Sequence, residues 1–243
     1  MTMLIFASLN ENESLSEFLF DEPNSFKSPK RILEKSLANK LIIYTLQNFY
    51  DYQLNTLPHI TKNEYGKPFF SDQSFPKYNI SHSKDLLVIA FSDKEIGVDL
   101  EYVNLNRNIK SIAKRFFTED ENSFINRNNE FYDKRFYLIW VLTEAMSKFI
   151  GKGFSSFNKE FSIELNANNN IFVNNNEFID NVYVGSIELD KHTYMFSYIS
   201  EQRELPKLYY FKDNKITSIS QHENLKNKTE CCNLKDYLSK NKI

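Results

Sequence analysis

The feature that most constrains this chain is a pair of acidic residues in an apolar stretch, Gly97-Val98-Asp99-Leu100-Glu101. They alternate with apolar neighbours as in a half-buried strand, so both carboxylates are expected on one face, about 6.6 Å apart along the chain. Two unit charges at that separation repel by roughly 2 to 3 kcal/mol at an effective dielectric of about 20. A partly buried pair therefore needs a cation, and carboxylate oxygens suit Mg²⁺ or Ca²⁺ better than zinc.

A polar run, Asn79-Ile80-Ser81-His82-Ser83, precedes this stretch and is interpreted as a loop that leads into an apolar strand, Leu86 to Phe91. With hydroxyl groups on both sides, His82 is compatible with holding a phosphate. A lone loop histidine is nevertheless more often a surface or capping residue. The same ordinary interpretation applies to Lys67, in the turn Gly66-Lys67-Pro68, because lysines in turns are usually solvated.

Composition predicts a globular protein with a sizeable core and argues against several partners. A chain of 243 residues, 41% of them hydrophobic, can bury about 70% of the surface that its unfolded form exposes. The formal charge of −2 gives no basic field, so charge does not indicate a nucleic-acid partner. Adjacent Cys231 and Cys232 cannot link distant segments, which fits a reducing compartment. The apolar run from Met3 to Ala7 is too short for a membrane span and lacks a basic leader, so we expect a first strand and a cytoplasmic protein.

The apolar spacing predicts an α+β fold with two similar lobes, residues 1–104 and 105–243, the second with a polar tail from about 221. A capping box is expected at Thr118 and Glu121. Asn166 to Asn176 is expected to be a hairpin. Helices are predicted over Arg31 to Tyr50, Arg107 to Phe117, Asp133 to Ile150 and Leu234 to Lys240, and later strands over Phe161 to Leu165, Ile171 to Asn174, Val182 to Leu189, Tyr194 to Ser200 and Leu208 to Lys212.

Three residues of the long helix, Trp140, Glu144 and Lys148, are spaced by four and so share one face. The glutamate and lysine could simply pair, which stabilises a helix by only about 0.2 to 0.5 kcal/mol. The rest of the helix is apolar, however, and burying charge is costly unless a partner or a metal meets it. The second interpretation predicts that Glu144 joins Asp99 and Glu101 around one cation.

Together these segments resemble the surfactin-type branch of the 4′-phosphopantetheinyl transferase superfamily, from about residue 30 to residue 165. The resemblance implies a pseudo-dimer of two similar α+β lobes. One departure is Thr143, where the family usually has lysine before the helix glutamate. The matching segments are Tyr65-Gly66-Lys67-Pro68, Asn79-Ile80-Ser81-His82-Ser83, Gly97-Val98-Asp99-Leu100-Glu101, Lys114-Arg115-Phe116-Phe117, Trp140-Val141-Leu142-Thr143-Glu144-Ala145, Lys148 and Gly151-Lys152-Gly153.

The resemblance implies transfer of phosphopantetheine from coenzyme A to a serine of an apo acyl or peptidyl carrier protein, releasing adenosine 3′,5′-bisphosphate. Mg²⁺ would be held by Asp99, Glu101 and Glu144. The proton acceptor would be Glu144, Glu121 or a metal-bound water, and Lys148 would lie against the pyrophosphate. Coenzyme A would be contacted by Lys67, Ser81, His82 and Lys148.

Several alternatives stay open at this level. The carrier, of nonribosomal peptide or polyketide type, would dock between the lobes near Phe116 and Phe117. A rival interpretation buries both rings in the core, and the helical phase of Phe116 favours it for that residue. Tyr44 stands where the family tends to carry a basic residue that meets the nucleotide. The chain could instead be a catalytically impaired module that binds carriers or coenzyme A, or a nucleotide pyrophosphate hydrolase. Two lobes in one chain predict a monomer.

Overall fold

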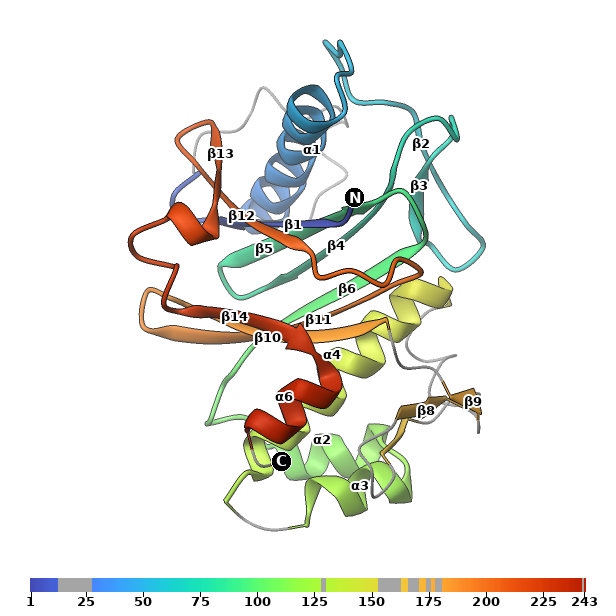
Figure 1. Cartoon of the computed structure of the whole chain (residues 1–243), viewed down its shortest axis with the longest axis vertical. Helices are drawn as coiled ribbons and strands as arrows, with labels where there is room; N and C mark the ends of the chain where they lie inside the picture. Colours follow the sequence, from blue (N-terminus) through green and yellow to red (C-terminus); the bar gives the residue numbers. More distant parts are fainter. Residues whose placement is uncertain are drawn as a thin grey trace.

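Two β-sheets face each other at the centre of the molecule, and each carries helices on its outer face (Figure 1). The computed structural model describes residues 1–12, 28–127, 130–152, 163–165, 171–173, 176–177, 181–241 and 243. Helix α1 covers the first sheet, and α4 packs on the second (Figure 1). The result is an α+β fold, as predicted.

The helices begin and end where the local chemistry expects. Ser28 caps α1 and a proline starts it, while Gly151 ends α4 in the left-handed conformation with φ +80°. The capping box predicted at the start of α3 is confirmed, with Thr118 and Glu121 each bonding the other's backbone. The helices are α1 (Pro29–Phe49), α2 (Ile109–Phe116), α3 (Glu119–Ile125), α4 (Tyr132–Ile150), the short η3 (Ile219–Gln221) and α6 (Leu234–Lys240).

The first sheet has five strands and the second has four. In hydrogen-bonded order, the first contains β13 (Lys215–Ser218), β12 (Lys207–Lys212), β1 (Met3–Ser8), β5 (Leu86–Ser92) and β4 (Lys77–Ser83). The second contains β14 (Thr229–Asn233), β10 (Val182–Leu189), β11 (His192–Ser200) and β6 (Ile96–Tyr102). Small separate sheets pair β2 (Ile60–Lys62) with β3 (Pro68–Phe70), and join β7 (Ile163–Leu165), β8 (Ile171–Val173) and β9 (Asn176–Glu177).

The chain exchanges strands between the two sheets in both directions. The hairpin β4–β5 belongs to the first sheet, but the next strand, β6, crosses to pair with β11. The hairpin β10–β11 belongs to the second sheet, but β12 crosses back to pair with β1. This reciprocal pattern, with α1 before one hairpin and α4 before the other, is the one expected of two similar lobes. A boundary near residue 104 stays a prediction, because each sheet draws strands from both sides of it.

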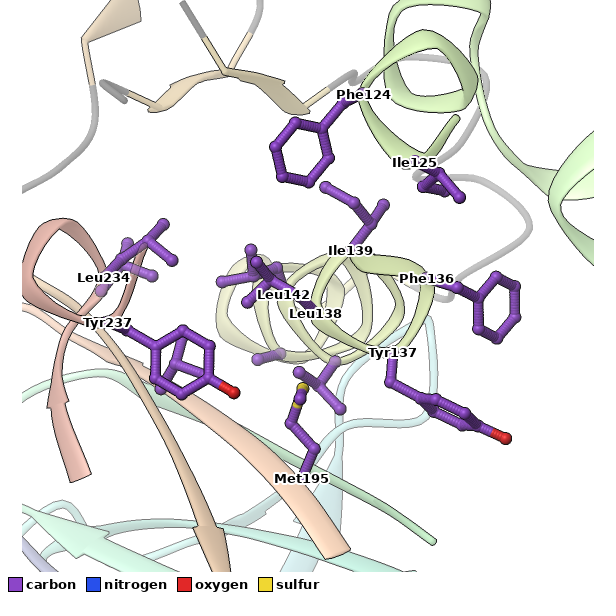
Figure 2. Packing of buried hydrophobic residues seen from close by; sticks show 14 of the residues in the cluster. Phe124, Ile125, Phe136, Tyr137, Leu138, Ile139, Leu142, Met195, Leu234 and Tyr237 are labelled. Carbon is purple, nitrogen blue, oxygen red and sulfur yellow. The ribbon is translucent and has the colours of Figure 1, made fainter. Parts of the chain in front are cut away.

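Apolar residues fill three interfaces between these layers. Alternate residues of β1 serve two of them: Met3 and Ile5 face α1, whereas Leu4 and Phe6 fill the space between the sheets. Helix α4 is apolar on most sides because it is surrounded, as Figure 2 shows. Its neighbours in that core come from α3 (Phe124 and Ile125), β11 (Met195) and α6 (Leu234 and Tyr237).

Two predictions of irregular structure are wrong. The polar run 79–83 is not a loop but part of strand β4, paired with β5. The region from residue 221 is not only a polar tail, because β14 pairs with β10 and Leu225 is buried. In both cases backbone pairing holds a polar segment in a sheet.

Some predictions fall outside the described residues. These are Gly153, the first two residues of the strand expected from Phe161, the last of the one expected to end at Asn174, and most of the Asn166–Asn176 hairpin. Within the part of the chain that the structure describes, no helix combines the length and the apolar character that crossing a membrane requires.

Candidate functional site

Strand β6 presents Gly97, Asp99 and Glu101 on the face opposite to its apolar residues. Val98 and Leu100 point into the core between the sheets, so the alternation predicted from sequence is confirmed. Helix α4 passes directly over the glycine: a Cβ at position 97 would lie 2.3 Å from the backbone oxygen of Ala145. Only glycine permits this approach, which brings the acidic strand against the helix.

Helix α4 carries Lys148 to the first carboxylate. The Nζ atom of Lys148 lies 2.7 Å from Oδ1 of Asp99 and 2.8 Å from Oγ of Ser81. The serine hydroxyl also donates to Asp99 Oδ1 at 2.8 Å. The Asp99 side chain is only 7% exposed, so its charge depends on these partners. Residues from β4, β6 and α4, far apart in sequence, therefore meet at one point.

The second carboxylate is held from two sides. Ser83 Oγ donates to Oε2 of Glu101 at 2.8 Å, and Arg107 donates through Nη1 to Oε1. The guanidinium carbon of Arg107 lies 5.0 Å from the centre of the Trp140 ring on α4. Each of the two strand carboxylates thus has a cationic partner in this structure.

Polar side chains of β4 cap the edge of β6 that faces away from β11. Asn79 and the two serines accept hydrogen bonds from backbone N–H groups that a further strand would otherwise bind. The distances are 3.0 Å from Val98 N to Asn79 Oδ1, 3.2 Å from Leu100 N to Ser81 Oγ and 2.9 Å from Tyr102 N to Ser83 Oγ. The two serines therefore fix the acidic strand and orient its carboxylates together.

Glu144 lies one turn before Lys148 and has an unusual protonation equilibrium. Burial, Asp99 and Glu101 together raise its pKa to about 7, and Lys148 opposes them. The electrostatic influence of both strand acids puts the three carboxyl groups in one neighbourhood. A cluster of three carboxyl groups offers the oxygen donors that Mg²⁺ prefers.

The metal site itself stays a prediction. Among the residues whose side chains are described, no group of three or more His, Cys, Asp or Glu side chains is positioned to hold a metal ion. The contacts above give the physical reason, since Lys148 and Arg107 occupy oxygens of Asp99 and Glu101 that a metal would need.

A pocket of about 300 Å³ opens beside these groups. Its wall combines the turn before β3, part of β4 and the last two turns of α4, including Lys67, Asn79, Glu144 and Lys148. The Lys67 ammonium donates to Glu95 Oε2 and to the backbone oxygen of Phe149, both at 3.0 Å. In this structure Lys67 therefore ties the turn to the end of α4, and its contact with a nucleotide stays a prediction.

The remaining predicted residues lie in different settings. His82 is 51% exposed and its Nδ1 atom lies 3.4 Å from Glu34 Oε1 on α1. Glu121 is buried and accepts from Thr118 N at 2.8 Å, so its observed role is to cap α3. Phe117 is 8% exposed and belongs to the core, which leaves only the partly buried Phe116 of that pair for a carrier surface. The expectation that both rings serve docking is therefore wrong for Phe117.

Comparison with known proteins shows which family these residues resemble. A family model described as the 4′-phosphopantetheinyl transferase superfamily matches residues 95–201, from β6 to β11. Over these residues the chain is similar to the superfamily. It is 28% identical to 4′-phosphopantetheinyl transferase Sfp of Bacillus subtilis over 193 residues, 75% of this chain and 83% of the relative. The resemblance predicted from the motifs, including that to the surfactin-type branch, is confirmed.

Other relatives match over shorter shares. 4′-Phosphopantetheinyl transferase ffp of Bacillus subtilis is 32% identical over 141 residues, 57% of this chain and 62% of the relative. 4′-Phosphopantetheinyl transferase HetI of Nostoc is 30% identical over 164 residues, 65% of both chains. This chain therefore covers less than two thirds of the length of each of these two relatives.

The departure from the superfamily pattern at Thr143 has a structural explanation. Thr143 is 1% exposed, and its Oγ1 donates to the backbone oxygen of Ile139 at 2.8 Å. The side chain is thus satisfied within α4. Tyr44, at the other departure, lies under the Lys40 ammonium at 5.7 Å and against Phe211, in the core beneath α1. The contact between Asp99 and Lys148 involves neither Thr143 nor Tyr44, so neither departure changes it.

Four residues of the site escaped the sequence prediction: Asn79, Ser83, Gly97 and Arg107. A signal existed for the first two, since they alternate with Ser81 at the period of a strand. Gly97 lies two residues before Asp99 and so shares the strand face of Asp99 and Glu101. Arg107 had no such signal, because the sequence predicts it as the first residue of a helix, whereas α2 begins at Ile109 and leaves Arg107 in the preceding loop.

Proposed function

We propose that this protein transfers 4′-phosphopantetheine from coenzyme A to a serine of an apo acyl or peptidyl carrier protein. The observation that carries the proposal is the contact of Lys148 with Asp99, which joins the acidic strand to the helix at the edge of a 300 Å³ pocket. Similarity to the superfamily over residues 95–201 supports the reaction class, and the name 4′-phosphopantetheinyl transferase of the relatives supports the group that is transferred.

In the proposed reaction, the serine oxygen attacks the phosphorus that bears the pantetheine arm. The bond from that phosphorus to the bridging oxygen breaks, and adenosine 3′,5′-bisphosphate leaves. The serine proton passes to Glu144, which lines the pocket in which the pyrophosphate would bind. Catalysis of this kind depends mainly on positioning and on neutralising charge.

Asp99, Glu101 and Glu144 would hold Mg²⁺ in this proposal. The ion would neutralise charge that builds up on the leaving phosphate. Lys148 would turn from Asp99 toward the pyrophosphate, since its side chain is 27% exposed and lines the pocket. Ser81 would keep Asp99 oriented throughout, because its hydroxyl bonds both the carboxylate and the backbone of β6.

The alternative, a catalytically impaired module of the same fold, rested on the replacement at position 143. Thr143 is buried and bonded within its helix, so the replacement gives no reason to expect a damaged pocket. The structure therefore favours the transferase over the binding module, although both would recognise carriers or coenzyme A.

The decisive experiment mixes the protein with coenzyme A, Mg²⁺ and a panel of apo carriers. A mass gain of one phosphopantetheine on the carrier serine supports the proposal. Asp99→Asn should abolish the gain while the protein stays folded. Unmodified carriers of both acyl and peptidyl type would contradict the proposal. Release of adenosine 3′,5′-bisphosphate without a carrier would indicate a hydrolase instead.

A further inference from the structure

Glu101 differs from Asp99 in the kind of cation that holds it. Arg107 reaches Glu101 Oε1 from the loop between β6 and α2, and its backbone N–H donates to the oxygen of Asn104 at 3.1 Å. Both partners are largely shielded from water, with side chains 19% exposed for Glu101 and 30% for Arg107. Charge-assisted contacts with a guanidinium are strong in such settings.

The guanidinium also contacts α4, the helix that carries Glu144. It lies over the Trp140 ring, 5.0 Å from its centre, and Trp140 precedes Glu144 by one helical turn. Arg107 is therefore fixed at two points, the acidic strand and the helix face that opposes it. Any movement of Glu101 toward Glu144 changes both contacts.

Ser83 holds the other oxygen of Glu101 without adding charge. Its hydroxyl donates to Oε2 at 2.8 Å and is itself fixed by the N–H of Tyr102 at 2.9 Å. The serine thus orients the carboxylate, whereas the arginine also neutralises it. A divalent cation bound at Glu101 would gain from the orientation that Ser83 gives the carboxylate, but the charge of Arg107 would repel it.

We propose that Arg107 is a positioning residue that holds Glu101 in the ligand-free protein and must release it when a divalent cation binds, so that Arg107 lowers the affinity of the carboxylate site for metal. The inference rests on the proposed function, because it takes Asp99, Glu101 and Glu144 as the ligands. It assigns to this chain a residue outside every segment that carried the family resemblance.

Removing the charge while keeping a hydrogen-bond donor isolates this effect. Arg107→Gln should bind Mn²⁺ about 10-fold more tightly than the wild type, the size of change typical of partners of metal ligands. Arg107→Lys keeps the cation and should stay close to the wild type. Binding is measured on the whole chain from the electron paramagnetic resonance signal of unbound Mn²⁺, with thermal melts to verify folding.

Arg127 offers a matched control. Its guanidinium lies 5.0 Å from the centre of the Phe124 ring, the same distance as that of Arg107 from the Trp140 ring, and Phe124 belongs to α3, which packs against α4 (Figure 2). Arg127→Gln removes the same charge and should leave Mn²⁺ affinity unchanged. A gain in both variants would indicate a general effect of net charge and overturn the proposal.

Trp140 supplies a second measurement, since it is the only tryptophan in the sequence. Mn²⁺ quenches fluorescence, so this titration uses Mg²⁺. The wild type should change its tryptophan emission as the guanidinium moves, and Arg107→Gln should show a smaller change. A role of Arg107 in fold stability alone would give neither this difference nor the rescue by lysine.

The outcomes separate the inference from the function on which it rests. If Asp99→Asn loses Mn²⁺ binding and phosphopantetheine transfer while Arg107→Gln binds Mn²⁺ no more tightly than the wild type, only the role of Arg107 is overturned. If Asp99→Asn binds Mn²⁺ as well as the wild type, the carboxylate site fails and the inference fails with it. Undetectable binding in both the wild type and Arg107→Gln also overturns the inference.

Discussion

Lys148 Nζ lies 2.7 Å from Asp99 Oδ1, across the interface between α4 and β6. Lys148 follows Glu144 by four residues on α4, and Asp99 precedes Glu101 by two residues on β6. The ion pair therefore joins the acidic face of β6 to the face of α4 that carries Glu144. If Asp99 holds a divalent cation, as proposed, this ammonium must first leave Oδ1. The contact is a structural link that the proposed metal site would have to break.

Replacing Lys148 by glutamine should destabilise the protein because the buried Asp99 charge loses its cation. We expect a loss of roughly 1 to 3 kcal/mol in the free energy of unfolding, measured by urea denaturation in EDTA. Added Mg²⁺ should recover much of it, while transfer activity stays lost. Lys212→Gln breaks an exposed pair with Glu11 and should cost less than about 1 kcal/mol. Equal effects for both lysines would contradict the importance of Asp99 burial.

Gly97→Ala tests how closely α4 approaches the acidic strand. The added Cβ would stand 2.3 Å from Ala145 O and 2.4 Å from Phe149 N, both backbone atoms that cannot rotate away. The helix must shift, and its Glu144 and Lys148 side chains shift with it. We expect stability to fall by roughly 1 to 3 kcal/mol and transfer to fall by more than the folded fraction explains. Stability like that of the wild type would show that α4 lies farther from β6.

The sequence contained these relationships only in part. Alternation predicted that Asp99 and Glu101 share a face, and a spacing of four predicted the same for Glu144 and Lys148, because both follow from the geometry of single elements. That the two faces meet depends on Gly97, whose missing side chain matters only once α4 lies over it. The polar pattern of residues 79–83 predicts a loop, whereas these residues form β4. Their side chains bond the edge of a strand in another sheet, a partner that the local pattern cannot specify.

Glu144 should make the stability of the metal-free protein depend on pH. Its pKa rises from 4.5 to about 7 on folding, chiefly through burial and then through Asp99. Folding therefore favours the protonated form, so the contribution is complete below about pH 4.5 and disappears as pH rises through about 7. The whole difference is about 3 kcal/mol for a shift of this size.

Comparing the wild type with Glu144→Gln in EDTA isolates this contribution. The glutamine variant should gain stability relative to the wild type as pH rises from 5 to 8, because it lacks the carboxyl that must ionise. Urea denaturation at several pH values measures the difference. A difference independent of pH would show that Glu144 ionises in the folded protein as readily as in the unfolded chain.

Ser83→Ala should weaken metal binding, the opposite of the effect expected for Arg107→Gln. The alanine removes the donor to Glu101 Oε2 and the acceptor for Tyr102 N, without changing any charge. Glu101 then loses orientation but no electrostatic attraction, so Mn²⁺ affinity should fall about 10-fold. The free energy of unfolding should fall by roughly 1 to 2 kcal/mol, since a half-buried N–H loses its partner.

Ser83→Thr is the matched control because it keeps the hydroxyl and suits a strand. Its Mn²⁺ affinity should stay within about 3-fold of the wild type, less than the change typical when a partner of a metal ligand is lost. If alanine and threonine at position 83 bind Mn²⁺ alike, the hydroxyl does not orient Glu101. If alanine instead strengthens binding, Ser83 hinders the metal as Arg107 is proposed to do. Glu101 would then have to leave both Ser83 and Arg107 before it could bind a cation.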